Sequence, residues 1–261
     1  MKKIVSPILF ALTLGAAVSA MAETPAPTEP GSTLAYNVGV VSDYRYRGIS
    51  QSRKQAALQG GVDYNDKSGF YVGAWGSSIK WIQDAGAKEG NVEIDLYGGY
   101  KGAAGDVAYD VGFLRYQYQG NTYGKANGAF PGYVDANTNE IYAAATMGLF
   151  TAKYSYAISN LFGNANTKGS YYLDLSAALD LGEAYSLTPH VGYQAVVNSP
   201  SVAAPISLGY TDYSLTLGKD LGNGLSGSAA VIGTNAKNGA YAFNGNQLGK
   251  SSLVVGVKYT F

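Results

Sequence analysis

The feature that most constrains this chain is an alternation of apolar and polar residues that recurs from residue 34 to the C-terminus. Successive side chains of a β-strand point to opposite faces, so this alternation predicts strands with one apolar and one polar face. We count about twelve such segments by this test. In the segment 106–118 the alternation changes phase near Leu114, which predicts a β-bulge. The segments begin near residues 34, 56, 69, 91, 106, 139, 150, 170, 184, 210, 224 and 252.

The connections between these segments alternate between long and short. The short ones are rich in Gly, Asn, Asp and Ala. The long ones fall near residues 48–55, 81–90, 119–138, 159–169, 198–209 and 235–251. This alternation is typical of bacterial outer-membrane barrels, which have short periplasmic turns and long extracellular loops. The expected fold is therefore all-β, an antiparallel up-and-down transmembrane β-barrel of about 12 strands with both termini in the periplasm.

The composition of the two strand faces indicates which solvent each one meets. Many positions of the apolar face are Ala or Gly, and the chain holds 35 glycines and 23 tyrosines. Small residues would leave a soluble barrel with a poorly packed core, but they are acceptable against lipid. The polar face then lines a wet lumen. Tyrosine is favoured at the membrane boundary, where its ring is apolar and its hydroxyl stays hydrated.

Both ends of the chain carry export and assembly signals. Residues 1–22 combine a basic start, the apolar stretch ILFALTLGAAVSA and the small residues Ala20 and Ala22, which predicts a signal peptide that is removed. Residues 23–33 are rich in Pro, Thr and Glu and are expected to form a flexible leader before a barrel over 34–261. The last alternating segment ends with Tyr259 and Phe261 on its apolar face. This ending resembles the signal that the barrel-assembly machinery reads in outer-membrane proteins.

Three stretches in the first part of the chain are similar to the TorF family of predicted porins. They are NVGVVSDYRYRGISQS (37–52), ALQGGVDY (57–64) and SGFYVGAWGSSIKW (68–81). The similarity is specific over residues 36–100, and further on only the strand rhythm and Phe261 agree. It implies a channel in the outer membrane of a Gram-negative bacterium, reached by export through the inner membrane. Some members of that family are linked by name to trimethylamine N-oxide respiration, but no motif in this sequence indicates that the same substrate applies here.

Motifs that could carry chemistry favour structural interpretations. His190, the single histidine, falls on the polar face of its segment, without a G-x-S-x-G nucleophile motif. Gly222, Gly224 and Gly227 spell G-x-G-x-x-G, but a strand–turn–strand context favours a hairpin over a dinucleotide site. The stretch DANTNE (135–140) partly resembles a calcium loop but lacks its glycine and its bidentate Glu. We therefore expect no catalytic residue, no cofactor and no metal site.

Charged residues of the polar face are the best candidates for a functional role. Asp43, Arg45 and Arg47 are expected near the extracellular mouth of the barrel. Tyr44 and Tyr46, which lie between them in the sequence, are expected in the outer aromatic girdle. Arginine and carboxylate groups opposed across a narrow pore would select solutes by charge and dipole. The pore-lining candidates are Asp43, Arg45, Arg47, Glu93, Asp95 and Arg115.

These observations predict an outer-membrane channel for passive diffusion of small polar solutes or ions, and not an enzyme. Two alternatives stay open: a structural or surface-interaction barrel with a plugged lumen, acting through its extracellular loops, and a membrane-embedded hydrolase. Eight-stranded barrels are filled by side chains and barrels of 16–18 strands are open, so twelve strands do not decide between the first two. The expected partners are outer-membrane lipid, the solutes and the barrel-assembly machinery. With 18 basic and 18 acidic residues, nothing indicates a nucleic-acid partner, and the sequence does not predict the oligomeric state.

Overall fold

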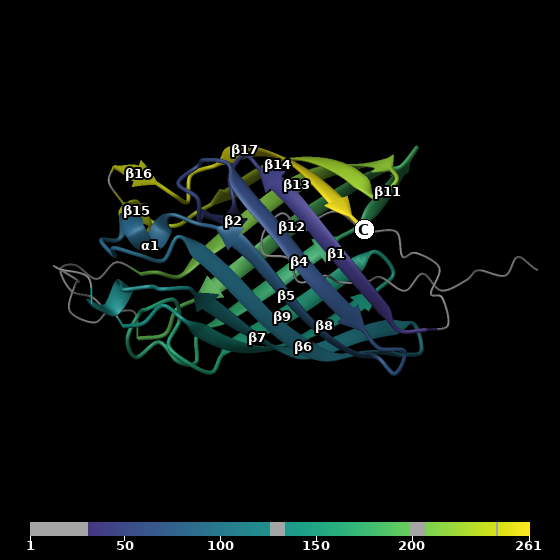
Figure 1. Ribbon diagram of the computed structural model, residues 1–261, viewed down its shortest axis with the longest axis horizontal. Coiled ribbons are helices and arrows are strands. Elements are labelled where there is room, and N and C mark those ends of the chain that lie inside the picture. Colours follow the sequence, from purple (N-terminus) through teal and green to yellow (C-terminus); the bar gives the residue numbers. More distant parts are fainter. Residues whose placement is uncertain (1–30, 126–133, 199–206, 244) are drawn as a thin grey trace, which may run out of the picture.

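The computed structural model describes residues 31–125, 134–198, 207–243 and 245–261, so the predictions for residues 1–30 lie outside the described residues. Its wall is one antiparallel sheet that closes when β1 pairs with β17 (Figure 1). Strands β10 and β11 both pair with β12 and form one wall strand interrupted at Ala178, which makes twelve wall strands. They are β1 (Thr33–Val41), β4 (Ala57–Asn65), β5 (Phe70–Ser78), β6 (Val92–Ala104), β7 (Val107–Tyr118), β8 (Thr138–Met147), β9 (Phe150–Ala157), β10 (Tyr171–Ala177) with β11 (Leu179–Gly182), β12 (Tyr185–Ala195), β13 (Tyr210–Gly222), β14 (Leu225–Thr234) and β17 (Ser252–Thr260).

The predicted barrel and its strand order are confirmed. Each observed wall strand begins within one residue of the predicted start. The short turns and both ends of the wall lie at one end of the barrel, and the long connections lie at the other (Figure 1). By the usual orientation of such barrels, the end with the short turns is periplasmic and the other is extracellular.

The glycine-rich stretch after β13 is a hairpin turn, as predicted. Gly222 pairs with Leu225, and the two residues between them, Asn223 and Gly224, have φ angles of 52° and 80°. Positive φ at both central positions is the type I′ geometry, which matches the twist of the flanking strands and favours Asn-Gly. The glycines of this G-x-G-x-x-G stretch therefore serve the geometry of a tight turn.

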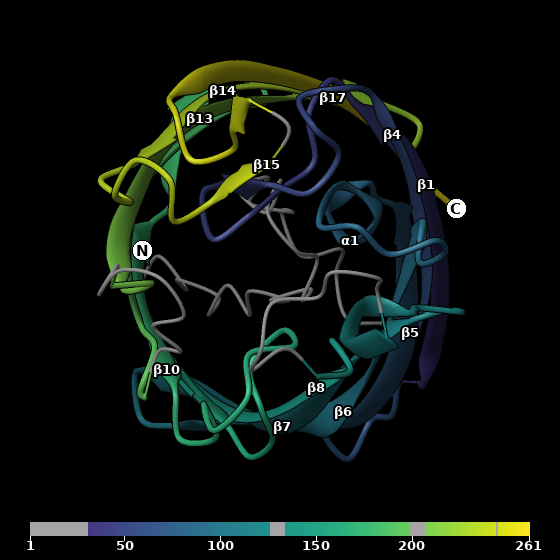
Figure 2. The same cartoon turned by 90° about the vertical axis from the view of Figure 1, so that its left-hand side faces the viewer.

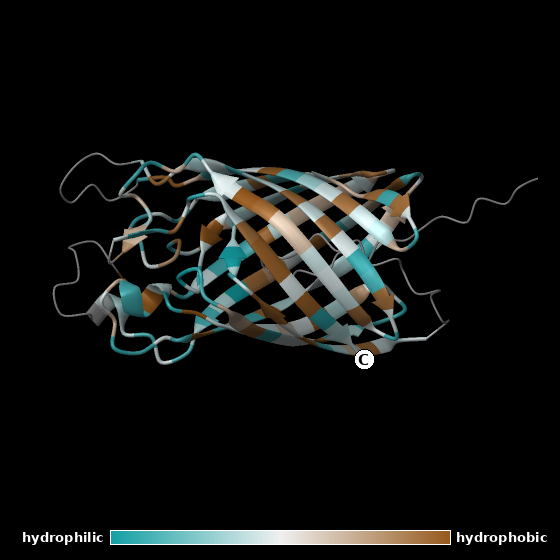
Figure 3. Ribbon diagram, turned by 90° about the horizontal axis from the view of Figure 1, so that it is seen from above, coloured by the Kyte–Doolittle hydropathy of each residue, from teal (hydrophilic) through white to brown (hydrophobic). Residues whose placement is uncertain are grey.

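The outward face of the wall is apolar, and hydrophobic and hydrophilic residues alternate along the strands (Figure 3). Val40 is 50% exposed and Leu253 66% exposed, an exposure that an aqueous surface would not sustain over a whole barrel. Near the periplasmic end the ring of Phe261 stacks on those of Tyr36 and Tyr259, with centroids 5.7 and 5.5 Å apart. This aromatic contact belongs to the girdle expected where a barrel meets the membrane interface.

The bulge predicted near Leu114 is wrong. Strand β7 pairs with β6 and with β8 in unbroken register from Val107 onward. The inward face of β7 changes from polar to apolar near Leu114, because Leu114, Tyr116 and Tyr118 all point into the barrel and are buried there. This change disturbs the apolar–polar alternation without a bulge. An apolar inward face at this height means that the lumen there is occupied by protein.

The continuous register of β7 also corrects the prediction for Arg115. Its neighbour on β6 is Leu96, which is outward and 46% exposed, so Arg115 lies on the outer face. There its guanidinium donates hydrogen bonds to the side-chain oxygens of Gln117 and Asn139. Arg115 therefore belongs to the outer rim and does not line the lumen.

The remaining elements are short and lie within the long connections. In the described part of the chain, no helix is long and apolar enough to cross a membrane. The short elements are β2 (Arg45–Tyr46), β3 (Ile49–Ser50), α1 (Trp81–Asp84), η1 (Tyr123–Lys125), β15 (Ala242–Phe243) and β16 (Asn246–Gln247).

Candidate functional site

The first extracellular connection folds into the barrel. Viewed along the barrel axis, the chain between β1 and β4 lies inside the ring of strands (Figure 2). Its strands β2 and β3 form a hairpin with Arg47 and Gly48 as its two-residue turn. A further bond from Gln51 N–H to the Tyr44 carbonyl extends the pairing, and we call residues 44–51 the inward hairpin. The φ angles of Arg47 and Gly48, 46° and 77°, make a second type I′ turn. A Cβ atom on Gly48 would lie 2.5 Å from the Thr234 side chain, so only glycine fits at this tip.

The inward hairpin overturns the prediction that Tyr44 and Tyr46 form an outer girdle. Tyr44 is fully buried, and its hydroxyl donates a 2.6 Å hydrogen bond to Glu93 of β6. The Tyr46 hydroxyl lies 2.5 Å from that of Tyr116 on β7. The wall strand ends at Val41, and the alternation that continues beyond it belongs to a hairpin with protein on both of its faces.

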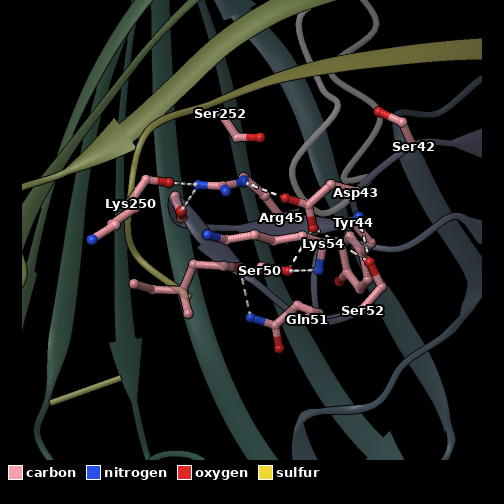
Figure 4. A network of polar contacts seen from close by, with 12 residues as sticks. Ser42, Asp43, Tyr44, Arg45, Ser50, Gln51, Ser52, Lys54, Lys250 and Ser252 are labelled. Atoms are coloured by element: carbon pink, nitrogen blue, oxygen red, sulfur yellow. Dashed lines mark hydrogen bonds and ion pairs between the residues drawn. The ribbon is translucent and has the colours of Figure 1, made fainter. Parts of the chain in front are cut away.

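A buried polar network holds the base of the inward hairpin (Figure 4). Asp43 accepts hydrogen bonds from Arg45 Nε at 2.8 Å and from Ser50 Oγ at 2.5 Å. Arg45 also donates to the backbone oxygens of Gly48 and Lys250, at 3.0 and 2.8 Å. Asp43 and Arg45 therefore lie inside the barrel but are covered by the hairpin, so the predicted wet environment for them is wrong.

Arg47 joins the tip of the inward hairpin to the opposite wall. Its guanidinium donates 2.7 Å hydrogen bonds to Glu140 of β8 and to Gln194 of β12. It also lies over the ring of Tyr172 on β10, 4.4 Å from the centroid. The order of the wall strands places β8 to β12 across the lumen from β1, where the hairpin starts. The hairpin therefore spans the lumen and narrows it.

Tyrosine hydroxyls contact many of the carboxylates inside the barrel. Glu93 and Asp95 both face inward on β6, but they are 1% and 2% exposed and are covered by protein like Asp43 and Arg45. One oxygen each of Asp95, Asp110 and Glu140 is buried without a hydrogen-bond partner in the described structure. The tyrosine–carboxylate contacts are Tyr44–Glu93, Tyr71–Asp110 and Tyr97–Asp63 at 2.6 Å, Tyr172–Asp212 at 2.9 Å and Tyr116–Glu140 at 3.2 Å.

These inward tyrosines were missed because tyrosine was assigned to the membrane boundary. The signal was nevertheless present in the sequence. Tyr97 follows Asp95 by two residues, so both must lie on the same face of β6. A tyrosine separated from a carboxylate by an even number of positions in a strand shares its inward face. Tyr100 is four positions from Leu96, which faces outward, so Tyr100 lies on the outer face.

His190 faces the lumen, as predicted, and both of its ring nitrogens lie near carboxylates. Nε2 is 3.0 Å from Asp174 and Nδ1 is 3.6 Å from Asp212. A hydrolase would need one of these nitrogens to accept a proton from a nucleophile while the other is held by an acid. Here the Nε2 also meets the Tyr172 hydroxyl, so the histidine is part of a structural network.

Acidic residues outnumber basic ones inside the barrel, counted over the described residues that face inward. In the same part of the chain, no group of three or more His, Asp or Glu side chains could hold a metal ion. The acidic residues are Asp43, Asp63, Glu93, Asp95, Asp110, Glu140, Asp174, Asp180, Asp212 and Asp220, and the basic ones are Arg45, Arg47, Lys101, Lys153 and Lys258.

A closed twelve-stranded barrel with an apolar exterior and a polar interior defines the class, which is that of outer-membrane β-barrels. The chain belongs to a family described as "Bacterial protein of unknown function (Gcw_chp)", which matches residues 25–261. Its structure is similar to that of NanC porin, with 10% sequence identity, a TM-score of 0.53 and coverage of 88% of this chain and 99% of that one.

A second similar structure is that of "KdgM porin in complex with disordered oligogalacturonate". Its sequence identity is 9% and its TM-score 0.50, again with coverage of 88% of this chain and 99% of that one. At such low identity, both likenesses concern the fold alone. No curated protein matches the sequence.

Proposed function

We propose that this protein is an outer-membrane channel for passive diffusion of small polar solutes, narrowed by the inward hairpin. The observation that carries the proposal is a closed barrel whose polar interior is crossed by the inward hairpin, with Arg47 at its tip bonded to the opposite wall. Charged groups at a constriction act on solutes at close range, where they filter by charge. The same proposal includes export by a signal peptide that is cleaved after the small residues Ala20 and Ala22. It also includes recognition of Tyr259 and Phe261 by the barrel-assembly machinery. The similarity to TorF family porins supports it and stays a prediction.

The negative interior favours neutral and cationic solutes over anions. The oligogalacturonate of the KdgM complex is built from sugars that each carry a carboxylate. Because acidic residues outnumber basic ones inside this barrel, such a polyanion would be repelled. We therefore infer that the solutes of this channel differ in charge from the ligand in that complex.

Reconstitution in planar lipid bilayers tests the proposal. We expect discrete current steps and, across a KCl gradient, a reversal potential that corresponds to a preference for cations. Folding is checked separately by the change in gel mobility on heating, which closed barrels show. A barrel that folds by this criterion but carries no current would contradict channel function, and a preference for anions would contradict the charge argument.

One observation favours a second candidate, the plugged barrel. The inward hairpin contributes Tyr44 to a buried core that also contains Trp75, Ile79 and Ile82, so protein fills part of the extracellular half. A variant in which residues 44–51 are replaced by a Gly-Ser linker distinguishes the two functions. If only this variant conducts, the native barrel is plugged and acts through its surface; if both conduct, it is a channel.

A further inference from the structure

A pocket rich in aromatic residues lies at the extracellular end of the barrel, next to the inward hairpin. It has an empty volume of about 780 Å³, including space open to solvent. Tyr46, Ile49 and Gln51 of the inward hairpin line one part of it. One aromatic wall contains Trp81, Tyr118 and Tyr123, and another contains Tyr210, Tyr241 and Phe243.

Edge-to-face contacts hold these rings in position. The ring of Trp81 is 5.3 Å from that of Tyr118 and 5.6 Å from that of Tyr123, with interplanar angles of 89° and 71°. On the other wall, Tyr210 and Tyr241 lie 5.2 Å apart at 78°. Because the rings already pack against one another, a ligand would lose little binding energy to ordering them.

The chemistry of the lining limits the kind of ligand. None of the side chains that line the pocket is charged, although acidic residues are frequent inside the barrel. Among its polar groups, Gln194 is already bonded to Arg47, and Gln51, Asn164 and the Tyr241 hydroxyl each donate to a backbone oxygen. The Nε1 of Trp81 is a buried donor with no hydrogen-bond partner in the described structure. A charged ligand would lose its hydration without gaining a partner of opposite charge, and the Trp81 Nε1 offers a single unpaired donor, too few for the many hydroxyls of a sugar. An uncharged, mostly apolar ring matches the lining.

We propose that this pocket binds a small uncharged compound with an aromatic ring at the entrance to the lumen. The ligand lies between the two aromatic walls and contacts the inward hairpin. The site differs in chemistry from the polar lumen beyond it. Its occupancy does not depend on whether the barrel conducts, so the two proposals can fail separately.

The chain has two tryptophans, which provide a matched pair of reporters. Trp81 lines the pocket, whereas Trp75 does not and instead packs against Tyr44, with ring centroids 5.5 Å apart. In Trp75→Phe the remaining fluorescence comes from Trp81, and in Trp81→Phe it comes from Trp75. Each variant is placed in lipid nanodiscs and titrated with 4-nitrobenzyl alcohol, a neutral quencher, and with 4-nitrobenzoate, its charged counterpart.

We expect saturable quenching by 4-nitrobenzyl alcohol in Trp75→Phe and only linear, collisional quenching in Trp81→Phe. Binding of 4-nitrobenzoate should be at least about tenfold weaker, because its carboxylate would lose hydration in an uncharged pocket. Equal linear quenching in both variants would overturn the proposal. So would equal affinity for the alcohol and the carboxylate, or binding of maltose in competition with the alcohol.

A second measurement keeps the test valid if a tryptophan variant does not fold. Calorimetry of 4-nitrobenzyl alcohol binding compares wild type with Phe243→Ala in the pocket and Phe113→Ala on the outer wall, where Phe113 is 40% exposed. The pocket variant should lose at least about tenfold in affinity, since it removes one aromatic ring from the lining. The outer variant should bind like wild type. Equal losses in both variants, or none in Phe243→Ala, would contradict the assignment.

Discussion

Replacing Arg47 by alanine removes the contact that joins the inward hairpin to the far wall. The change deletes two hydrogen bonds of 2.7 Å and leaves Glu140, which is 1% exposed, without its cation. Removing one partner of a buried ion pair costs about 3–5 kcal/mol. Since each 1.4 kcal/mol is a factor of about ten, the ratio of docked to undocked hairpin should fall by about two to four powers of ten.

Single-channel recording in planar bilayers measures the consequence. We expect Arg47→Ala to conduct more than wild type, because the hairpin leaves the lumen, and to prefer cations more strongly, because a positive charge is lost. Arg47→Lys separates these effects. Lysine keeps the charge but cannot bond both wall residues through a rigid fork, so conductance should rise while selectivity stays close to wild type.

Arg115→Ala is the matched control, because it removes the same side chain from the outer rim. It should leave conductance and reversal potential unchanged. If Arg47→Ala behaves like wild type, or if Arg115→Ala produces the same shift, the inward hairpin does not control the pore.

Two further predictions concern turns at opposite ends of the barrel. Gly48→Ala places a Cβ 2.5 Å from the Thr234 side chain, so it should displace the hairpin tip and increase the conductance. Gly105→Ala is the control, because Gly105 also has a positive φ (61°) but has open space around it, and it should leave the conductance unchanged. Equal effects of the two substitutions would refute the steric argument. In the periplasmic turn, hydrogen bonds from the Ser68 hydroxyl and backbone N–H lower the pKa of Asp66 to about 2. The stabilisation from its carboxylate is therefore complete above about pH 4, the usual pKa of Asp, and is lost as the pH falls through about 2. Nuclear magnetic resonance of the Ser68 amide should titrate with that low midpoint, and a midpoint near 4 would contradict it.

The wall of the barrel could be predicted because each strand shows its two faces within its own sequence. Leu34, Val38 and Val40 alternate with inward residues whatever the rest of the chain does, and the turn after Gly222 is specified by Asn-Gly. Local periodicity and turn chemistry thus suffice for strand positions and connection lengths.

The inward hairpin could not be predicted in the same way, because Tyr44 and Tyr46 alternate with charged residues as a wall strand would. Whether an alternating segment faces lipid or fills the lumen depends on residues far away in the sequence, such as Glu93 and Tyr116. Only Gly48, placed directly after Arg47, indicated a turn. Arg115 was misplaced for a related reason, since charge alone does not show the side of the wall on which a residue lies.

The contacts of the inward hairpin also determine when it can form. Arg47 bonds a residue 147 positions further along the chain, and Arg45 bonds one 205 positions further. Contacts of such long range become available only after the strands that carry them have been placed. The hairpin follows the first wall strand in the chain, yet its contacts are complete only when residues up to Lys250 are in place. We therefore expect an assembly intermediate in which the hairpin is incompletely docked and the lumen is wider than in the finished protein.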